Sequence, residues 1–553
     1  MIKFNDLLTE TAAGWQWHLP AQFNIAYACV RQHVEQNRGR KTALIIEDDK
    51  LGSRELSYEQ LDLLSGRFVY TLKELGLSSD DRVLIRLPNS VDYPVSFFAC
   101  MKHGAVAVPT STLLSAAEVA YLAKDSGAKA LVIDKSMWSE LKSIFNECAQ
   151  LESVLLAGSG DMPLDIHGLA VQVLDMEKLL SSNPVIDTIV ASSPNDPAYL
   201  VYTSGTTGYP KGVLHAHRSL IGRLPASRFW FDFKEGDRIL HSGKFNWTYV
   251  LGSALMDPLF HGHSVIVHEG ENNASTWPRL IKKHHCTIFI GVPTIYRQII
   301  QKTEFQGTDV PSLRHCMSAG EHLSDEMLLR WRERFTMDVY EAIGMSECSY
   351  YISHNKERPV RPGSAGFVQP GHEVALLNEL NQPVQAGEEG MIAIRDSDPG
   401  LFLGYWRLPE ETAKACFDGY FFTGDYARID DDGYIWFVGR KDDIINTFGY
   451  RVSPHEIERV IKTHPDVADC VALGEVISKE KILVSVCIIL TPDAVTSAQE
   501  ILEFGNKHLA QYKTPKIVHF YDDFPRTKNG KVLRKQMLAE ITEKQLSSAG
   551  EGA

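Results

Sequence analysis

The sequence lacks the features that mark secreted, membrane-spanning or disulfide-stabilised proteins. Its nine cysteines are scattered, with no CxxC pair and no Cys/His metal spacing, which favours reduced thiols over a disulfide framework. No apolar run approaches the roughly 20 residues of a membrane span. The first residues, MIKFNDLLTETAAGW, carry acidic side chains and lack the apolar core of a signal peptide. We therefore expect a cytoplasmic protein with no integral membrane segment.

An excess of basic residues is also absent. The net charge of −14 argues against a broad nucleic-acid surface but not against local basic sites for anions. The chain shows no short-period repeat, heptad array or extensive low-complexity segment. With 553 residues and 44% hydrophobic content, it can bury a substantial core and is too long for one compact domain.

Short apolar runs alternate with helical segments through the first half of the chain. Strands are predicted at residues 82–87, 105–109 and 128–134, with helices at 91–103 and 116–126 between them. The same alternation returns with strands at 264–268 and 287–291 and helices at 277–284 and 293–302. Such a pattern is typical of βαβ units in a mainly parallel sheet covered on both faces.

The pattern changes twice in the second half of the chain. Near Gly363, turns rich in glycine and proline separate short strands, such as 374–377 and 391–395, which indicates a smaller β-rich subdomain. The charged tetrapeptide RKDD then interrupts apolar runs, and we place a domain boundary at Lys441–Asp442. About 110 residues follow, an ordinary size for an independent domain.

The segment from Tyr202 to Gly212, YTSGTTGYPKG, combines three glycines, four hydroxyl side chains and Lys211. Hydrogen-bond donors and a positive charge on a loop with this backbone freedom suit a polyphosphate. The segment differs from the common P-loop, because its lysine is not followed by serine or threonine. On composition alone, a surface turn remains the alternative.

Further clusters of polar residues follow, each weak on its own. They are SAGEHL at 318–323, EAIGMSE at 341–347, YFFTGD at 420–425, the arginines at 440 and 451, and PRTKNGKVLRK at 525–535. A carboxylate such as Glu347 could serve a Mg²⁺ ion that keeps waters and also binds phosphate oxygens. A carboxylate such as Asp425 could accept both hydroxyls of a ribose.

Together and in this order, these motifs resemble those of the adenylate-forming superfamily, which includes acyl-CoA synthetases, adenylation domains and luciferases. The resemblance extends from about Leu56 to Leu538. Within the superfamily, the sequence is most similar to the acyl-CoA synthetase branch, including benzoate-type and medium-chain ligases. It implies an α/β fold with a large N-terminal AMP-binding domain, residues 1–441, of stacked mixed sheets with helices and a β-rich subdomain. A small mobile α+β C-terminal domain, residues 442–553, would carry the catalytic lysine.

The resemblance also implies roles in binding ATP, here for residues at the matching positions. Thr203, Ser204, Gly205, Thr206, Thr207 and Lys211 would hold the β- and γ-phosphates. Gly320, Glu321, Glu341, Ala342 and Ile343 would frame adenine, although Ile343 departs from the tyrosine of many relatives. Ser346 would touch the α-phosphate, Glu347 would anchor Mg²⁺, Asp425 and Arg440 would hold the ribose, and Arg451 a phosphate.

Two half-reactions are implied. Lys531 would bridge the acid and the α-phosphate while ATP and the acid form an acyl-adenylate and pyrophosphate, because a cation there stabilises charge in the transition state. The C-terminal domain would then rotate about a hinge at Asp442. Phe448 and Gly449 would then line the tunnel for coenzyme A, whose thiol displaces AMP.

The acyl pocket implied by the resemblance comprises Trp247, Thr248, Tyr249, Ala319 and Gly344. Relatives restricted to acetate carry tryptophan at the position of Gly344, so we expect a larger acid here, and Gly344→Trp to shift preference toward short acids. Aromatic side chains at Phe245, Trp247 and Tyr249 suit a ring or a medium-length chain, with a role as core aromatics the alternative for Phe245 and Tyr249.

The predicted function is therefore that of an AMP-forming carboxylic acid–CoA ligase using ATP, Mg²⁺ and coenzyme A. A stand-alone adenylation enzyme that loads a carrier protein would share the first half-reaction, and a luciferase-like oxygenase would share the motifs. A nucleotide-binding regulator without activity is a further alternative, which the retention of Lys531, Glu347 and Asp425 disfavours. The expected partners are small molecules, with no nucleic acid, and a homodimer is compatible with this interpretation.

Overall fold

The computed structural model describes residues 2–12, 14–163, 165, 169–203, 210–320, 323–440, 443–447, 450–478, 481–492, 494–509, 511, 513–526 and 532–550. The chain divides into two compact units. Unit 1 comprises Met1–Glu373 and Arg395–Gly419, and unit 2 comprises Val374–Ile394 and Tyr420–Ala553. The predicted domain boundary at residues 441 and 442 lies outside the described residues and stays a prediction.

One large sheet of unit 1 has eight strands in the order β21-β11-β10-β6-β5-β7-β8-β9. They are β5 (Arg82–Arg86), β6 (Val106–Pro109), β7 (Ala130–Asp134), β8 (Ser153–Ala157), β9 (Gln172–Asp175), β10 (Pro197–Thr203), β11 (Lys211–Ala216) and β21 (Gly404–Tyr405). The strands from β10 to β9 pair in parallel, whereas β11 pairs antiparallel with both β10 and β21. The predicted parallel sheet is thus confirmed and gains an antiparallel edge.

The second large sheet of unit 1 has nine strands in the order β18-β17-β16-β15-β14-β12-β13-β3-β4. They are β3 (Thr42–Asp48), β4 (Gly52–Ser57), β12 (Arg238–His241), β13 (Ser264–Glu269), β14 (Ile288–Gly291), β15 (His315–Ala319), β16 (Val339–Gly344), β17 (Tyr350–Ser353) and β18 (Phe367–Val368). Pairing is parallel from β16 to β3 and antiparallel at both edges.

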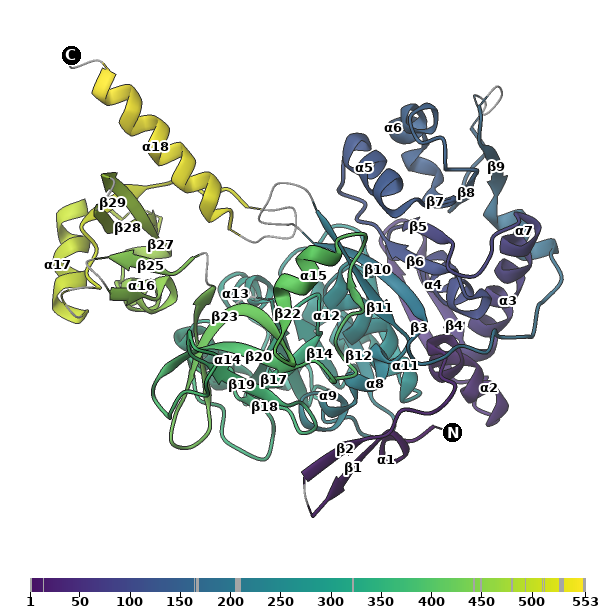
Figure 1. The fold of residues 1–553 in the computed structure, drawn as a ribbon, viewed down its shortest axis with the longest axis horizontal. Coiled ribbons are helices and arrows are strands. Elements are labelled where there is room, and N and C mark those ends of the chain that lie inside the picture. The colour runs from purple at the N-terminus through teal and green to yellow at the C-terminus, as the bar shows by residue number, and fades with distance from the viewer. Residues whose placement is uncertain are drawn as a thin grey trace. The chain divides into compact units, whose positions relative to one another are not determined.

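Helices between the strands begin and end where local signals place them. Ser115 caps α5 (Ala116–Ser126) by accepting from the Glu118 amide, and Gly127 ends the helix with φ of 63°. Gly104 ends α4 (Asp92–His103) in the same left-handed conformation. The other longer helices of unit 1 are α3 (Tyr58–Glu74), α7 (Met176–Ser182), α12 (Thr276–His284), α13 (Pro293–Lys302) and α14 (Asp325–Phe335). Figure 1 shows them alongside the two large sheets.

Alternate side chains of the nine-stranded sheet enter two separate hydrophobic clusters, as the two-residue repeat of a strand requires. Phe289 and Cys316 pack with Trp331 and other residues of α12, α13 and α14. Met317 and Ala319 instead join a cluster with Trp230, which follows α9 (Leu224–Phe229). This second cluster reaches the carboxyl ends of β15 and β16, where the candidate site lies.

Shorter elements complete unit 1. They are α1 (Phe4–Leu7), β1 (Leu8–Thr11), β2 (Gly14–Trp17), α2 (Gln32–Glu35), α6 (Trp138–Leu141), α8 (Ser219–Gly222), α10 (Thr248–Val250), α11 (Asp257–Phe260), α15 (Pro409–Ala415) and β22 (Cys416–Phe417). Among the described residues, no helix combines the length and apolar character needed to cross a membrane.

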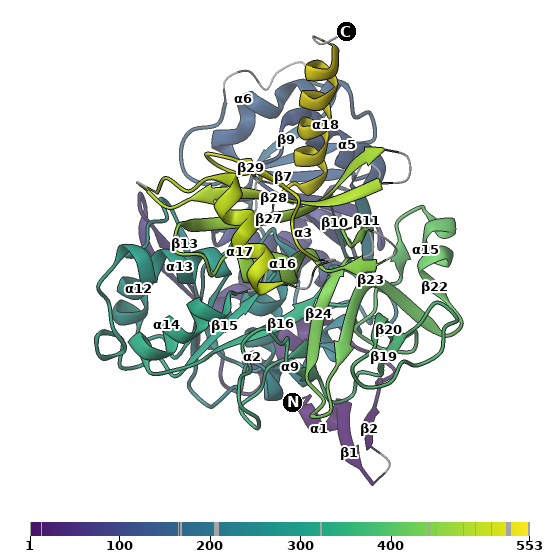
Figure 2. The ribbon, with the colours of Figure 1, turned by 90° about the vertical axis from the view of Figure 1, so that its left-hand side faces the viewer.

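Unit 2 contains the predicted β-rich segment together with the C-terminal residues. The first part has antiparallel pairs between β19 (Val374–Leu377) and β20 (Glu389–Arg395), and between β23 (Tyr420–Ile429) and β24 (Ile435–Arg440). The second part has the strand order β27-β28-β29. Its elements are β25 (Ile445–Thr447), β26 (Tyr450–Val452), α16 (Pro454–Ile461), β27 (Val467–Ser478), β28 (Lys481–Leu490), α17 (Ala498–His508), β29 (Ile517–Phe520) and α18 (Arg534–Gly550). In Figure 2, α16 and α17 lie against this sheet.

Candidate active site

The predicted phosphate loop connects two paired strands. β10 ends at Thr203 and β11 begins at Lys211, and these two residues are direct partners in the antiparallel ladder. β10 is largely buried, so the predicted loop follows a buried strand. Ser204, Gly205, Thr206 and Thr207 lie outside the described residues, so their roles stay predictions, and the structure fixes the two flanking positions.

The ammonium group of Lys211 contacts one acidic side chain and one aromatic ring. Its Nζ atom lies 2.8 Å from Oε2 of Glu411 and 5.4 Å from the centre of the Tyr405 ring. The other carboxylate oxygen of Glu411 lies 2.8 Å from Nζ of Lys414. Hydrogen bonds from Lys211 and Lys414 lower the pKa of Glu411 to about 2. Lys211 is therefore a cation that already holds an anion.

Glu347 lies in the turn between β16 and β17 and is buried. Its Oε1 atom accepts a 2.8 Å hydrogen bond from the hydroxyl of Tyr405, and its carbonyl oxygen accepts one from the Phe402 amide. The neighbouring carbonyl of Ser346 accepts a 2.7 Å hydrogen bond from the His215 ring. Because His215 belongs to β11 and Tyr405 to β21, the two large sheets meet at this turn.

Tyr405 thus contacts both Lys211 and Glu347, two residues that the sequence predicts to belong to a phosphate and metal site. Among the described residues, no group of three or more acidic, histidine or cysteine side chains is arranged to hold a metal ion. A single buried carboxylate fits a Mg²⁺ ion that arrives with phosphate oxygens and keeps its waters. Glu347 is the residue that would hold that ion.

The predicted adenine-binding residues lie at the carboxyl ends of two parallel strands. Ala319 on β15 pairs with Ala342 on β16, and Gly320 follows with an exposed backbone and φ of 94°. Glu341 accepts a 2.7 Å hydrogen bond from the Leu323 amide, so its carboxylate supports the returning chain. Ligands of open α/β sheets bind outside such strand ends. Ile343 is half-buried, and Glu321 lies outside the described residues.

Three predicted acyl-pocket residues lie close together. The rings of Trp247 and Tyr249 meet edge to face at 5.3 Å, and Tyr249 packs against the cluster that contains Ala319 and Ala342. A Cβ atom at Gly320 would lie 3.4 Å from the indole of Trp247. The aromatic surface therefore adjoins the predicted adenine-binding backbone. Thr248, between the two rings in sequence, is half-buried.

Phe245 has the alternative role considered from the sequence. It is 1% exposed and stacks on Tyr93 at 5.4 Å, and its amide donates to the side chain of Asn89. Phe245 is therefore a core aromatic that fixes the start of the 245–250 segment.

Gly344 is exposed at the end of β16, but the space beside its Cα atom is filled by backbone. A Cβ atom at this position would overlap the carbonyl oxygen of Ser349 across the turn, whose closing hydrogen bond joins the Met345 amide to that same oxygen. The expected effect of Gly344→Trp is thereby corrected: any larger residue must first displace the turn that carries Glu347. The main effect of the substitution is therefore expected on the conformation of the turn, and only then on the size of the pocket.

A buried ion pair supports the same turn. Arg223, 2% exposed, makes a two-pronged contact with Asp257 at 2.8 and 3.0 Å. It also donates to the hydroxyls of Ser349 and Tyr350. A Cβ atom at Gly252 would overlap the guanidinium group, so glycine there leaves the path of this side chain open.

Asp257→Ala is expected to lower the free energy of unfolding by about 3–5 kcal/mol, because it leaves the Arg223 charge buried without its partner. Chemical denaturation of purified protein measures this loss. The matched control is Glu147→Ala, which breaks the exposed pair between Lys124 and Glu147 and should change stability by less than about 1 kcal/mol. Equal effects of the two substitutions would contradict the anchoring role of the buried pair.

The predicted ribose-binding residues lie in unit 2 and face each other across a strand pair. Asp425 on β23 is the ladder partner of Arg440 on β24, and Oδ1 of Asp425 lies 3.3 Å from Nε of Arg440. The Asp425 amide donates to the hydroxyl of Thr423. Asp425 is buried and the Arg440 side chain is 46% exposed, so the carboxylate is held in place while the guanidinium group stays accessible.

The remaining predicted residues cannot be placed. Asp442, Phe448, Gly449 and Lys531 lie outside the described residues, and only the backbone of Arg451 is described, in β26. Tyr405, Glu411, His215 and Arg223 were not predicted as parts of the site. Tyr405 and Glu411 lie about 200 residues from Lys211 in sequence, and a spacing rule cannot link residues so distant.

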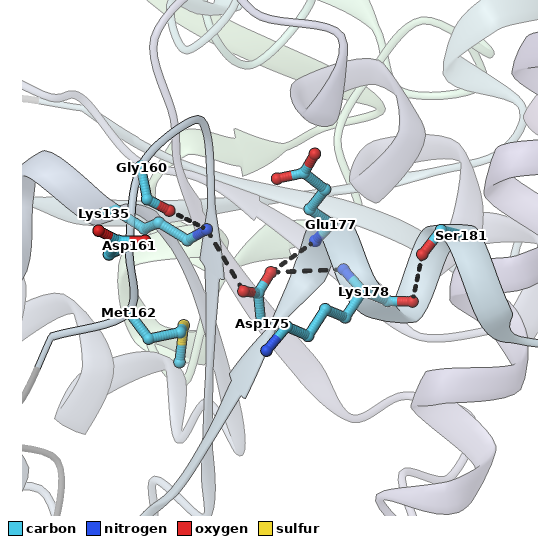
Figure 3. A pocket seen from close by; sticks show the side chains of 8 residues that line it. All are labelled: Lys135, Gly160, Asp161, Met162, Asp175, Glu177, Lys178 and Ser181. Carbon is cyan, nitrogen blue, oxygen red and sulfur yellow. Dashed lines mark hydrogen bonds and ion pairs between the residues drawn. The ribbon is translucent and has the colours of Figure 1, made fainter.

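A cavity of about 390 Å³ lies at the other edge of the eight-stranded sheet, near the ends of β7, β8 and β9. Figure 3 shows its lining, which is Lys135, Gly160, Asp161, Met162, Asp175, Glu177, Lys178 and Ser181. Lys135 bonds to the Gly160 carbonyl at 3.0 Å and lies 3.4 Å from Asp175, which also caps α7. These internal partners account for the arrangement without a ligand.

Comparison with known proteins gives consistent matches along the chain. Residues 30–406 match the model of the family described as AMP-binding enzyme, and residues 456–531 match the AMP-binding enzyme C-terminal domain. The 3-hydroxybenzoate–CoA ligase of Aromatoleum sp. (strain CIB) is 32% identical over 498 residues, 89% of this chain and 92% of the relative. The mitochondrial acyl-coenzyme A synthetase ACSM3 of Mus musculus is 31% identical over 492 residues, 87% and 83%.

A solved structure agrees with these matches. The anthranilate CoA ligase AuaEII, in complex with anthranoyl-AMP, superposes with a TM-score of 0.84 at 28% sequence identity. The superposition covers 94% of this chain and 98% of that protein, so the similarity extends over both units.

Proposed function

The chain belongs to the AMP-binding enzyme family, and we propose that it joins an aromatic or other ring-bearing carboxylic acid to coenzyme A through an acyl-adenylate. The observation that carries this proposal is the shared contact of Tyr405 with Lys211 and Glu347, together with the aromatic pair Trp247 and Tyr249 next to the predicted adenine-binding backbone. A phosphate-binding cation, a carboxylate and an apolar acid pocket are the parts that such a ligation needs.

In the first half-reaction, a carboxylate oxygen of the acid attacks the α-phosphorus of ATP, and the bond to pyrophosphate breaks. Lys211 and Thr203 hold the outer phosphates at the strand ends, and Ser346 contacts the α-phosphate. Glu347 would hold Mg²⁺, which would neutralise phosphate charge. Asp425 and Arg440 bind the ribose, and Lys531 stabilises the negative charge at the reacting phosphorus.

In the second half-reaction, the thiol of coenzyme A attacks the acyl carbon, and AMP leaves with the bonding electrons. The hinge at Asp442 and the thiol tunnel at Phe448 and Gly449 belong to this step of the proposal. Their support is the resemblance of the segment GRKDDIINTFGYR, residues 439–451, to a motif of the adenylate-forming superfamily.

The choice of a ring-bearing acid rests on the residues of the predicted acyl pocket. Trp247 and Tyr249 present aromatic faces and edges, and such surfaces pack best on planar rings. The relatives named as a 3-hydroxybenzoate–CoA ligase and an anthranilate CoA ligase act on aromatic acids. The relative named acyl-coenzyme A synthetase ACSM3 makes a medium-length aliphatic acid the second candidate.

A panel of acids tests this proposal. With ATP, Mg²⁺ and coenzyme A, benzoate-type acids are expected to give kcat/KM at least about fivefold above hexanoate and octanoate, since one good aromatic contact pair contributes about 1 kcal/mol beyond area. AMP release measures turnover, and thioester formation with coenzyme A alone separates a ligase from a carrier-loading enzyme. Absence of acid-dependent ATP–pyrophosphate exchange with every acid would refute the proposal.

A further inference from the structure

The segment from residue 402 to residue 415 runs beside β11 and places the carboxylate of Glu411 in contact with Lys211. β21 pairs antiparallel with β11, and the Trp406 amide donates to the Gly212 carbonyl at 2.8 Å. α15 then begins at Pro409. The hydroxyl of Thr412 accepts a 2.9 Å hydrogen bond from the Tyr405 amide. The position of α15, and with it that of Glu411, is therefore fixed relative to the strand that starts with Lys211.

Glu411 divides its two oxygens between two lysines. Oε2 faces Lys211 and Oε1 faces Lys414, each at 2.8 Å. The Lys211 side chain is 20% exposed, whereas that of Lys414 is 71% exposed. Because hydrogen bonds from the two lysines lower the pKa of Glu411 to about 2, this carboxylate is ionised throughout the neutral range. It is a permanent anion at the entrance to the predicted phosphate loop.

A phosphate oxygen of ATP and the Glu411 carboxylate need the same donor. An ammonium group has three hydrogens to donate, and the Tyr405 ring already occupies one side of Lys211. A fixed carboxylate in contact with the lysine also repels an incoming polyanion. If Lys211 takes a phosphate, Glu411 keeps Lys414, three residues on along the same helix, as its remaining partner.

We propose that Glu411 is an internal competitor for the phosphates of ATP: it contacts Lys211 and Lys414 when no phosphate is bound, keeps only Lys414 when phosphate takes Lys211, and returns to Lys211 to help expel pyrophosphate. Glu411 then sets the affinity for ATP and pyrophosphate without touching either reacting atom. This inference rests on the proposed function of Lys211 as a phosphate ligand.

Glu411→Gln is expected to lower the KM for ATP about three- to tenfold and to lower the inhibition constant for inorganic pyrophosphate by a similar factor. A merely structural role predicts the opposite sign, because lost contacts weaken substrate binding. Lys414→Met should raise the KM for ATP, since Glu411 then has only Lys211 as a partner. Both constants are measured by AMP release, with thermal denaturation confirming that each variant is folded.

Glu410→Gln provides the matched control, because it removes the same charge from the adjacent, exposed position of α15 and should leave both constants within about twofold of the unchanged protein. Lys211→Met separates this inference from the proposed function. If Lys211→Met raises the KM for ATP but Glu411→Gln leaves it unchanged or raises it, the competitor role is wrong and the phosphate role stands. If Lys211→Met has no effect on ATP binding, the phosphate role itself fails.

Discussion

Replacing Lys531 by alanine is expected to slow acyl-adenylate formation by about 10²–10³-fold, the loss typical when one preorganised electrostatic group is removed from a transition state. The acid carboxylate must approach a phosphorus surrounded by negative oxygens, and a cation between them offsets this repulsion. Thioester formation from acyl-adenylate supplied in advance should change much less, because the proposed role of Lys531 ends with the first half-reaction.

Two assays on the same preparation give the comparison. Acid-dependent ATP–pyrophosphate exchange reports the first half-reaction, and release of AMP from added acyl-adenylate and coenzyme A reports the second. Lys528→Ala is the matched control, since it removes an equal charge three residues earlier in the same basic loop. Equal losses in both half-reactions would overturn the assignment, as would equal losses in the two variants.

Acidification from pH 8 to pH 5 is expected to lower the free energy of unfolding by about 12 kcal/mol. Six of the buried histidines of unit 1 contribute to this loss: His33, His215, His217, His241, His263 and His315. Burial lowers the pKa of each of them from 6.5 to about 3 or 4. In the unfolded chain these histidines therefore bind protons near pH 6.5, whereas in the folded chain they stay neutral at that pH.

The sign follows from this difference in proton uptake. Stability is complete above about pH 6.5 and falls as the pH drops toward the folded-state values, because the unfolded state holds more protons in that window. At pH 5, each histidine contributes a loss of about 2 kcal/mol, given 1.36 kcal/mol for each pH unit below the unfolded value. Since whole domains are stable by about 5–15 kcal/mol, acid unfolding should begin near pH 5.

Urea denaturation at several pH values measures the effect, and the slope of the unfolding free energy against pH should correspond to at least about six protons for the intact chain. His315→Asn should reduce that slope by about one proton, whereas His508→Gln, at an exposed position on α17, should leave it unchanged. A slope below about two protons between pH 5 and pH 6 would show that the buried rings titrate normally.

The sequence predicted the secondary structure of the α/β part closely, for local reasons. α5 and α13 begin and end at the predicted residues, because a serine cap with Glu118, a proline at the first turn of α13, and Gly127 are signals contained in the helices and their ends. The family resemblance was likewise confirmed, by two family models in the predicted order. Its motifs are contiguous stretches that a single sequence displays.

Contacts between distant parts of the chain were not predicted. Nothing in YTSGTTGYPKG indicates that Lys211 pairs with Glu411, because the pairing depends on β21 joining the edge of the sheet beside β11. The sequence also does not show what a side chain at a glycine position would meet. At Gly344, a Cβ atom would meet the carbonyl oxygen of Ser349. The roles of Lys531, Asp442 and Gly449 remain predictions, as do the assembly state and the cytoplasmic location.

The late arrival of β21 in the chain has a consequence for biosynthesis. On the ribosome, β11 and its lysine emerge long before residues 404 and 405, which supply its outer neighbour. Until then the nascent polypeptide carries an open strand edge, the kind of surface that recruits other chains. Translation must therefore proceed past residue 405 before this edge is covered. Until then, the exposed edge is a binding surface for chaperones.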